Sequence, residues 1–226
     1  AQLQGFLAYD DAAEGKRPGV LVVHEWWGLN DYARQRARQL AELGYVAFAL
    51  DMYGQGKQTE HPREAGKWAA EIRENVAQWQ QRAQAGLDVL KGRDEVDQER
   101  LAAIGYCFGG ATVCQLAYAG VGLKGVVSFH GSLPAPTTEQ ASQIDARLLI
   151  CHGAEDPFVP PEQVDIFQAA LKDAKAQWQM IIYSGAEHSF TNPGADERNI
   201  NGLGYNQEAD ESSWEHMKLF FADVLE

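Results

Sequence analysis

Cys107 lies at the centre of a Gly-x-Cys-x-Gly segment, Gly105–Gly109. The apolar run Leu101–Tyr106 leads into this segment, and a helical pattern begins near Gly110. A nucleophile on a tight turn from strand to helix needs small residues two positions to either side, because the backbones there pass closely. Such a turn also places the sulfur at a helix N-terminus, where the helix dipole favours a thiolate. The spacing therefore predicts a nucleophilic cysteine, and the alternative is a buried structural cysteine beside a glycine-rich turn.

Two other residues are placed to work with this cysteine. Asp156 follows the apolar run Leu148–His152 in an Asp-Pro turn, and His188 follows the run Trp178–Tyr183. The carboxyl ends of parallel strands meet at one edge of a sheet, so we expect both side chains to converge on Cys107. The chain order of nucleophile, acid and histidine is the one that accompanies a strand-to-helix nucleophile.

The three residues have distinct expected roles. Cys107 attacks a carbonyl carbon, His188 accepts and returns the proton, and Asp156 fixes the tautomer of the imidazole. Glu155 and Glu187 lie next to the preferred residues and are the alternatives for the acid. Asp156 is preferred because an Asp-Pro turn is a rigid mount for its carboxylate.

The remaining histidines carry weaker signals. His24-Glu25 is not followed by a second histidine at helical spacing, and no Cys-x-x-Cys pair occurs, so no metal site is predicted. No Walker-type phosphate-binding motif occurs either, and we expect no cofactor. We expect His61 to be a solvated loop residue and His216 to be a structural residue on the last helix. We expect His152 to be a turn residue at a strand end and His130 to line the pocket.

Apolar segments rich in Val, Ile and Leu alternate with helical patterns along the chain. The segments are short and continuously apolar, which is typical of parallel strands that are covered on both faces. The alternation favours an α/β fold with a mostly parallel, doubly wound sheet and flanking helices in one domain, residues 1–226. Leu3–Tyr9 is expected to be an antiparallel edge strand. The other predicted strands are Val20–His24, Tyr45–Leu50, Leu101–Tyr106, Gly125–Phe129, Leu148–His152 and Trp178–Tyr183.

Helix signals lie between these strands. Asp31 is expected to cap a helix over Tyr32–Leu43 that ends at Gly44. Pro161 fits the first turn of another helix, and the apolar stripe within Trp214–Leu225 predicts a closing helix.

Two polar segments, Gly54–Glu64 and Thr191–Glu211, follow predicted strands. Loops of this length in a compact domain tend to be functional or mobile. We expect both to hang over the carboxyl edge of the sheet, where open α/β folds bind ligands, and the second to act as a lid.

The composition limits the classes of protein and partner. The chain has 226 residues and a mass of 25.0 kDa, with 45% apolar and 23% charged residues, which fits a soluble globular domain. The formal net charge of -13 argues against nucleic acids and anionic membranes, because both are bound through Lys and Arg. Because the chain begins at Ala1 within a predicted strand, we expect that an upstream segment was removed. The compartment is cytoplasmic or, if that segment was a signal peptide, periplasmic or secreted.

Five motifs are spread over the chain: Val23–Gly28, Asp51–Gly54, Gly105–Gly110, His152–Pro160 and Ala186–Phe190. In type and order they resemble the dienelactone hydrolase family of α/β-hydrolases. The resemblance implies an α/β-hydrolase fold and a catalytic triad made by the cysteine, aspartate and histidine named above.

The resemblance also implies roles for residues that spacing alone does not single out. It implies that Glu25 pairs with the resting nucleophile and controls its ionisation, and the alternative is a salt bridge to a loop arginine. It places the oxyanion hole at the backbone N–H groups of Trp26 and Phe108. Family members that hydrolyse dienelactone hold its carboxylate with two arginines, and the corresponding positions here carry Gly54-Gln55 and Asn192. We therefore expect a substrate other than dienelactone, because these residues lack the charge of arginine.

These features predict a cysteine-dependent hydrolase of small carboxylic esters or lactones that works through an acyl-thioester intermediate. Arg198, on the second polar segment, is a candidate cation for an acidic substrate. Trp26, Trp27 and Phe190 are alternatively core residues. The predicted substrate pocket is lined by Trp27, Tyr53, His130, Phe158 and Phe190.

Two other functions use the same cysteine. In a thiol redox sensor or catalytically silent protein, Cys107 would oxidise with Cys114 or Cys151 as its partner. Cys114 lies about two helical turns, ~10 Å, further along the helix, which is too far for a disulfide without unwinding. An acyltransferase would use the same triad with an acceptor other than water. The sequence leaves the oligomeric state open.

Overall fold

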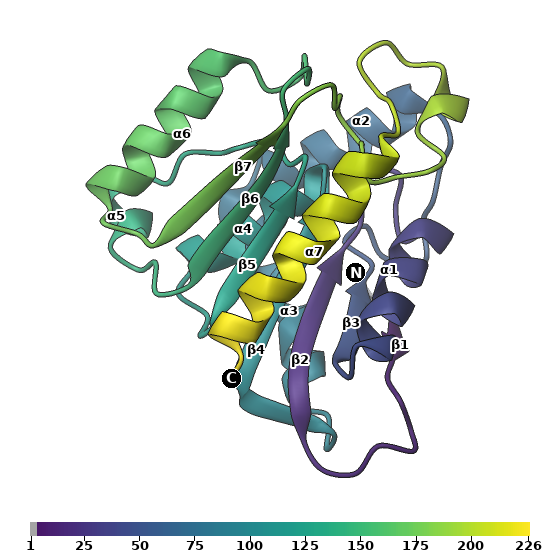
Figure 1. Cartoon of the computed structure of the whole chain (residues 1–226), viewed down its shortest axis with the longest axis vertical. Coiled ribbons are helices and arrows are strands. Elements are labelled where there is room, and N and C mark those ends of the chain that lie inside the picture. The colour runs from purple at the N-terminus through teal and green to yellow at the C-terminus, as the bar shows by residue number, and fades with distance from the viewer. Residues whose placement is uncertain (1–3) are drawn as a thin grey trace.

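A computed structural model describes residues 4–226 and shows a seven-stranded sheet between two layers of helices (Figure 1). The strands are β1 (Gly5–Ala8), β2 (Arg17–Val23), β3 (Val46–Leu50), β4 (Val96–Tyr106), β5 (Gly125–Phe129), β6 (Arg147–Gly153) and β7 (Trp178–Tyr183). Their order in the sheet is β1-β3-β2-β4-β5-β6-β7, and only the β1–β3 pair among them is antiparallel. The predicted sheet is confirmed, and Leu3 of the predicted edge strand lies outside the described residues.

The helices form a layer on each face of the sheet. They are α1 (Asp31–Glu42), α2 (Pro62–Arg73), α3 (Val76–Lys91), α4 (Phe108–Tyr118), α5 (Thr138–Ala141), α6 (Pro161–Asp173) and α7 (Gln207–Val224), with a 3-10 turn η1 at Asp196–Arg198. Side chains of α1 and α7 pack against one face, and those of α2, α3, α4 and α6 pack against the other. In Figure 1, α7 crosses the front of the sheet and α4 lies behind it.

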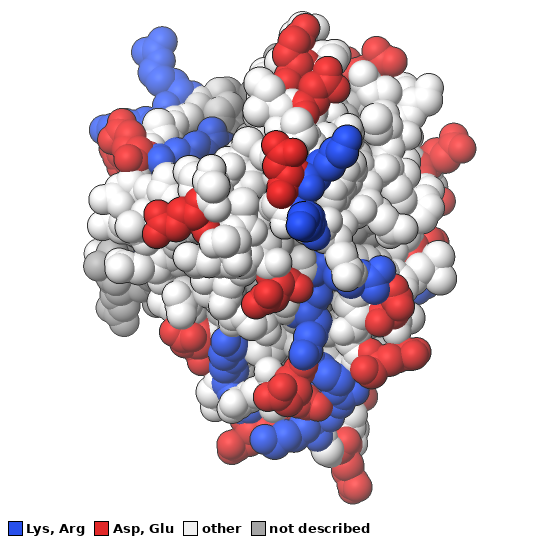
Figure 2. Space-filling view, turned by 90° about the vertical axis from the view of Figure 1, so that its left-hand side faces the viewer, with Lys and Arg blue, Asp and Glu red and all other residues white. Residues whose placement is uncertain are grey.

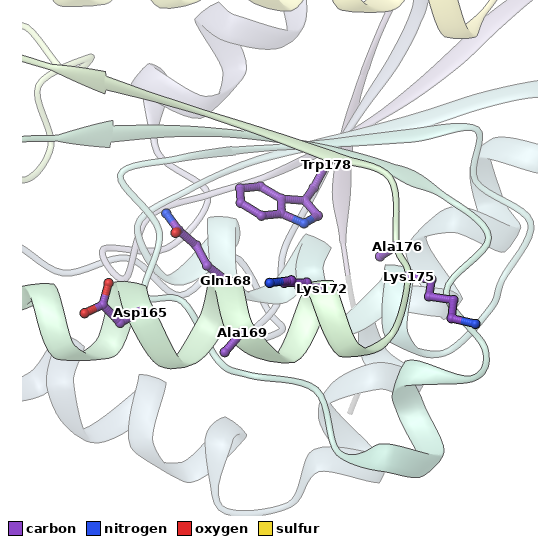
Figure 3. A pocket seen from close by; sticks show the side chains of 7 residues that line it. All are labelled: Asp165, Gln168, Ala169, Lys172, Lys175, Ala176 and Trp178. Carbon is purple, nitrogen blue, oxygen red and sulfur yellow. The ribbon is translucent and has the colours of Figure 1, made fainter.

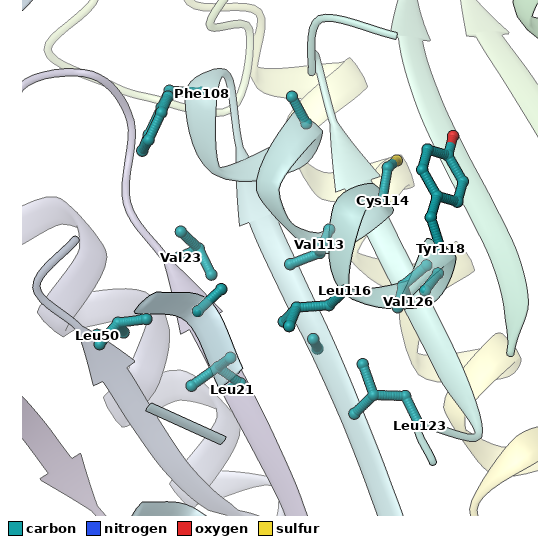
Figure 4. Packing of buried hydrophobic residues seen from close by; sticks show 14 of the residues in the cluster. Leu21, Val23, Leu50, Phe108, Val113, Cys114, Leu116, Tyr118, Leu123 and Val126 are labelled. Carbon is teal, nitrogen blue, oxygen red and sulfur yellow. The ribbon is translucent and has the colours of Figure 1, made fainter. Parts of the chain in front are cut away.

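The central strands bury side chains on both faces. In β2, Val20 and Val22 belong to the core under α1 and α7, whereas Leu21 and Val23 belong to the core under α3 and α4. Figure 4 shows the second core, in which α4 presents Val113 and other apolar side chains to the strands. Because neither face of these strands meets water, their sequences are continuously apolar, as in other parallel sheets.

Several helix ends differ from the prediction. Asn30, not Asp31, caps α1, and its side chain accepts a hydrogen bond from the N–H of Ala33. Asn is as good an N-cap as Asp, and the acidic residue is then favourably placed in the first turn. Because α2 begins at Pro62 and α7 begins at Gln207, both polar segments are shorter than predicted. The sequence reading did not single out α2 and α3.

Charges of both signs are interspersed on the face that Figure 2 presents. A file of Lys and Arg side chains runs down this face, and acidic side chains lie on both sides of the file. No single-sign region covers this face. None of the helices within residues 4–226 combines the length and the apolar character that a membrane crossing requires.

Candidate active site

Cys107 occupies the sharp turn between β4 and α4. Its backbone has φ 55° and ψ -113°, a conformation that costs energy for a residue with a Cβ atom. The flanking glycines are required by contact: a Cβ on Gly105 would lie 2.0 Å from the carbonyl oxygen of Gly109, and one on Gly109 would lie 2.1 Å from that of Val23. The strand-to-helix turn that the spacing predicts is therefore present, with the thiol at the N-terminus of α4.

His188 and Asp156 meet beside this turn. The Nδ1 atom of His188 donates a hydrogen bond of 2.7 Å to Oδ2 of Asp156. The other carboxylate oxygen, Oδ1, accepts a hydrogen bond of 2.9 Å from the backbone N–H of Phe158. Both side chains are buried, and each oxygen of Asp156 has a donor, so the carboxylate orients the imidazole as the acid of a triad does.

The imidazole of His188 strongly retains a proton. Burial by itself lowers its pKa, but the charge of Cys107 and the hydrogen bonds with Asp156 and Cys107 outweigh burial and raise the pKa to about 10. At neutral pH this environment favours a positively charged His188 next to the sulfur. A positive charge at this place stabilises a thiolate.

The two backbone N–H groups predicted to form an oxyanion hole donate no hydrogen bond to any of residues 4–226. Phe108 is the first residue of α4, so its N–H has no intrahelical partner. The N–H of Trp26, in the turn after β2, donates no hydrogen bond to the described residues either. The carbonyl of Trp26 accepts a hydrogen bond of 2.9 Å from the Tyr53 hydroxyl, which helps to hold this turn.

Glu25 is buried, but its hydrogen bonds differ from those that the resemblance implies. Oε1 accepts a hydrogen bond of 2.7 Å from the Ser189 hydroxyl, and Oε2 accepts one of 2.6 Å from the Asn192 amide. Burial raises the pKa of Glu25, against the lowering effect of these two bonds. The expected pairing with Cys107 is absent from this arrangement, because both carboxylate oxygens are directed to the segment that follows His188.

The predicted pocket residues divide into two groups. Phe158 is 49% exposed, and its ring centroid lies 5.3 Å from that of His188, so it can contact a substrate. Tyr53 is buried beside Phe108, the residue after the cysteine, with ring centroids 5.7 Å apart. Three other residues, Trp27, His130 and Phe190, are at most 1% exposed, so their part in lining a substrate pocket stays a prediction.

Packing explains why these three side chains are buried. Trp27 packs against Ala65 and Leu203 in a small cluster, and Phe190 belongs to the core under α7. The ring of His130 contacts the imidazole of His188, with centroids 5.4 Å apart, and its Nε2 bonds the hydroxyl of Thr191 at 2.7 Å.

The segment between His188 and α7 is tied to the site by its backbone. The N–H of His188 donates to the carbonyl of Gly202 at 3.1 Å, and the N–H of Gly204 donates to the carbonyl of His188 at 3.1 Å. Arg198 stacks on the ring of Trp27 at 4.6 Å and lies 3.5 Å from Glu60. These backbone bonds hold His188 in place. The guanidinium of Arg198 already has two partners, Trp27 and Glu60.

Two further cysteines and two further histidines lie outside this arrangement. Cys114 and Cys151 are free and buried, and burial raises the pKa of both thiols to about 12. His61 is exposed, and His216 bonds the Tyr183 hydroxyl at 3.0 Å. Within the part of the chain that the structure describes, no group of three or more His, Cys, Asp or Glu side chains is arranged to hold a metal ion.

A surface hollow of about 430 Å³ lies between α6 and the start of β7 (Figure 3). Trp178, the first residue of β7, forms one wall, and Lys172 and Gln168 of α6 form another. The hollow is at the amino end of β7, whereas Cys107 follows the carboxyl end of β4. It contains no residue of the triad.

A mostly parallel sheet with flanking helices, a nucleophile turn after a central strand, and an Asp and a His after two later strands define an α/β-hydrolase. A family model described as "Dienelactone hydrolase family" matches residues 3–225. The chain belongs to the dienelactone hydrolase family, and it is a hydrolase that acts on ester or lactone bonds.

Relatives and solved structures agree with this membership. The chain is 29% identical to a putative carboxymethylenebutenolidase of Saccharolobus solfataricus, over 99% of this chain and 95% of the relative. It is 41% identical to the solved structure named m3DLH, with a TM-score of 0.96 over 98% of this chain and 92% of that one. The dienelactone hydrolase-like promiscuous phosphotriesterase P91 from metagenomic libraries is 36% identical, with a TM-score of 0.94 and full coverage of both chains.

Two features of this site were not predicted from the sequence. His24 was considered only as a metal ligand, although it is completely buried beside the turn that carries Trp26. The hydrogen bonds of Asn192 and Ser189 with Glu25 were also not predicted. The sequence shows that His24, Ser189 and Asn192 lie in or next to the motifs. Their hydrogen-bond partners, however, depend on which strands are neighbours in the sheet.

Proposed function

We propose that the protein hydrolyses carboxylic esters or lactones with Cys107 as the nucleophile, through an acyl-thioester on its sulfur. The observation that carries this proposal is the position of a strained cysteine at a helix N-terminus next to the His188–Asp156 pair. Asp156 holds the imidazole, and the imidazole holds the proton that the thiol releases.

Acylation begins with attack of the Cys107 thiolate on the carbonyl carbon. The carbonyl π electrons move to oxygen, and the N–H groups of Trp26 and Phe108 stabilise the oxyanion. When the tetrahedral intermediate collapses, the bond to the alcohol oxygen breaks, and the imidazolium of His188 donates its proton to that oxygen. The products of this half-reaction are the alcohol and a thioester; a lactone gives both in one molecule.

Deacylation uses the same groups in reverse. Neutral His188 takes a proton from water while the water oxygen attacks the thioester carbon. The same two N–H groups hold the second oxyanion, and its collapse breaks the bond to sulfur. The carboxylic acid leaves, and the thiolate–imidazolium pair of Cys107 and His188 is restored.

Glu25 supports this chemistry from behind the histidine. Its carboxylate joins the turn after β2 to Ser189 and Asn192, and so fixes the chain that leaves His188. In this assignment Glu25 is a positioning residue.

The substrate that fits this site best is an uncharged ester or lactone. The Asn192 amide is engaged by Glu25, and the Arg198 guanidinium is engaged by Trp27 and Glu60, which leaves neither free for a substrate carboxylate. The exposed ring of Phe158 beside the catalytic imidazole suits an apolar acyl or alcohol group.

A neutral phosphotriester is a second candidate substrate. The full-length similarity to P91, at 36% identity, favours it. A thiolate and two N–H donors can act on a phosphoryl group as they do on a carbonyl group. Release of p-nitrophenol from a neutral p-nitrophenyl phosphotriester tests this candidate.

Hydrolysis of p-nitrophenyl acetate by the wild type, Cys107→Ala and Cys114→Ala tests the proposed function. We expect turnover by the wild type and Cys114→Ala, and a loss of roughly a thousandfold or more in Cys107→Ala. Equal turnover in all three proteins would refute the nucleophile. No turnover in the wild type, together with reversible oxidation of one thiol by peroxide, would favour the redox sensor, and transfer to added alcohols would favour the acyltransferase.

A further inference from the structure

His24 directly follows β2, and its ring contacts both the Glu25 carbonyl and the Phe108 ring. Its side chain is completely buried. The imidazole centroid lies 5.1 Å from that of the Tyr53 ring and 6.1 Å from that of the Phe108 ring, against which it is stacked. The proposed triad makes no use of this buried imidazole.

The hydrogen bonds of His24 define its tautomer. The backbone N–H of Met52 donates to Nε2 at 3.1 Å, so Nε2 carries a lone pair. Nδ1 then carries the hydrogen, and it donates to the backbone carbonyl of Glu25. Burial lowers the pKa of His24 to about 4, so the ring is neutral and this tautomer persists at neutral pH.

The backbone of Met52, whose N–H donates to His24, is itself held in place. The carboxylate of Asp51 accepts hydrogen bonds from the N–H groups of Tyr53 at 3.0 Å and Gly54 at 2.8 Å. The turn after β3 is therefore rigid. It fixes the His24 ring, and the ring in turn fixes the turn after β2.

The carbonyl that His24 binds belongs to the same peptide group as the N–H of Trp26. A peptide group is planar, so holding the Glu25 oxygen also sets the direction of the Trp26 hydrogen. A hydrogen bond to the oxygen polarises the group and strengthens the N–H as a donor. The N–H of Gly28 donates a second hydrogen bond, of 3.3 Å, to the same oxygen, which reinforces this orientation.

We propose that His24 is a positioning residue that aims and polarises the Trp26 N–H of the oxyanion hole. This role rests on the proposed function, in which a thioester forms on Cys107. His24 touches neither the substrate nor the sulfur, and its effect is confined to steps that develop an oxyanion.

Two polar substitutions separate the two nitrogens of the ring. In His24→Asn the amide nitrogen lies where Nδ1 lies and can still donate to the Glu25 carbonyl. In His24→Gln the amide lies near the position of Nε2, and the donor to Glu25 is lost. His61→Asn, at the exposed histidine that precedes α2, is the matched control. Thermal unfolding of each variant establishes that it is folded.

Two rates are measured on each folded protein. Acylation is followed as the pre-steady-state release of p-nitrophenol from p-nitrophenyl acetate, and it requires an oxyanion hole. Alkylation of Cys107 by iodoacetamide is a direct displacement at carbon, and it requires only the thiolate. A structural fault in the site would change both rates, whereas a fault in the oxyanion hole changes only the first.

The expected result follows from the cost of losing one oxyanion donor, which is roughly 100-fold to 1,000-fold in kcat. Misaiming a donor costs less, and we expect acylation to slow about 10-fold to 50-fold in His24→Gln, with KM within about twofold. His24→Asn should lose about threefold or less, and alkylation should be unchanged in both.

Three outcomes would overturn the inference: equal acylation rates in His24→Gln and the wild type, equal losses in the Asn and Gln variants, or parallel losses of acylation and alkylation. If the wild type itself forms no acyl-enzyme, the proposed function fails first. That result is distinct, because it does not depend on any His24 variant.

Discussion

Two regions near Cys107, the first and the second side of the site, are held in place in different ways. The first consists of short turns, and the second is the segment after His188, whose hydrogen-bond partners lie far away in the sequence. The first side consists of the turn between β4 and α4 and the turn after β2, which are shaped by glycines and by bonds to backbone groups. On the second side, Thr191 bonds the Tyr32 hydroxyl at 2.6 Å and Asn192 bonds Glu25, partners 159 and 167 residues away.

A buried ion pair supports the second side. Arg36 of α1 pairs with Asp210 of α7, and it also donates to the carbonyl of Thr191 at 2.6 Å. Its guanidinium lies 5.2 Å from the ring of Trp214. The comparison teaches that changes on the first side act on the chemical step directly, whereas changes on the second side act by displacing His188 or by weakening the fold.

The largest effect should come from Asp156→Asn, because Asp156 bonds the imidazole of His188 directly and belongs to neither side. An amide in place of the carboxylate favours the wrong tautomer of His188 and no longer stabilises its charge, so we expect kcat to fall roughly a thousandfold or more. Steady-state kinetics measure this loss, and Asp165→Asn on α6 is the control. A kcat within a few-fold of the wild type would mean that Asp156 is not the acid.

Arg36→Met should weaken the whole second side. Removing one partner leaves the charge of Asp210 buried and uncompensated, which typically costs about 3–5 kcal/mol in the free energy of unfolding. Urea titration measures this free energy, and Arg34→Ala, at an exposed pair, should cost less than about 1 kcal/mol. If Arg36→Met unfolds like Arg34→Ala, the second side does not depend on the buried pair.

Asn192→Ala tests the bond between the two sides. The Asn192 amide lowers the pKa of Glu25, which burial has already raised, so its loss raises that pKa further. Glu25 then takes up its proton at a higher pH, and the acid limb of the kcat profile should move upward, with kcat at neutral pH about threefold to tenfold lower. An unchanged pH profile would show that Glu25 does not act through this bond.

The smallest effect should come from Arg198→Ala. Because this guanidinium stacks on Trp27 and faces Glu60, we expect KM for both neutral and anionic esters to change by less than about twofold. A selective rise in KM for anionic esters would restore Arg198 as a substrate cation.

The same contrast explains what the sequence could predict. The turn between β4 and α4 depends on local sequence, because Gly105 and Gly109 must lack side chains for it to form. The strands next to it are recognisable from their apolar runs. The convergence of Asp156 and His188 follows from parallel strands ending at one edge. These features need no knowledge of distant partners.

The features that were missed depend on long-range pairing. The partner of Glu25 depends on where the chain after His188 returns, and the burial of Phe190 depends on how α7 covers the sheet. The role inferred for His24 depends on Met52, which approaches it because β2 and β3 are neighbours. Residue type and spacing alone do not contain this information.

The most direct test of the central claim is rapid-quench intact-mass analysis of the wild type during turnover of p-nitrophenyl acetate, followed by peptide mapping. We expect a transient acetyl adduct on the peptide that contains Cys107, absent from Cys107→Ala. Turnover with no adduct on this cysteine, or with the acetyl group on another residue, would show that Cys107 is not the nucleophile.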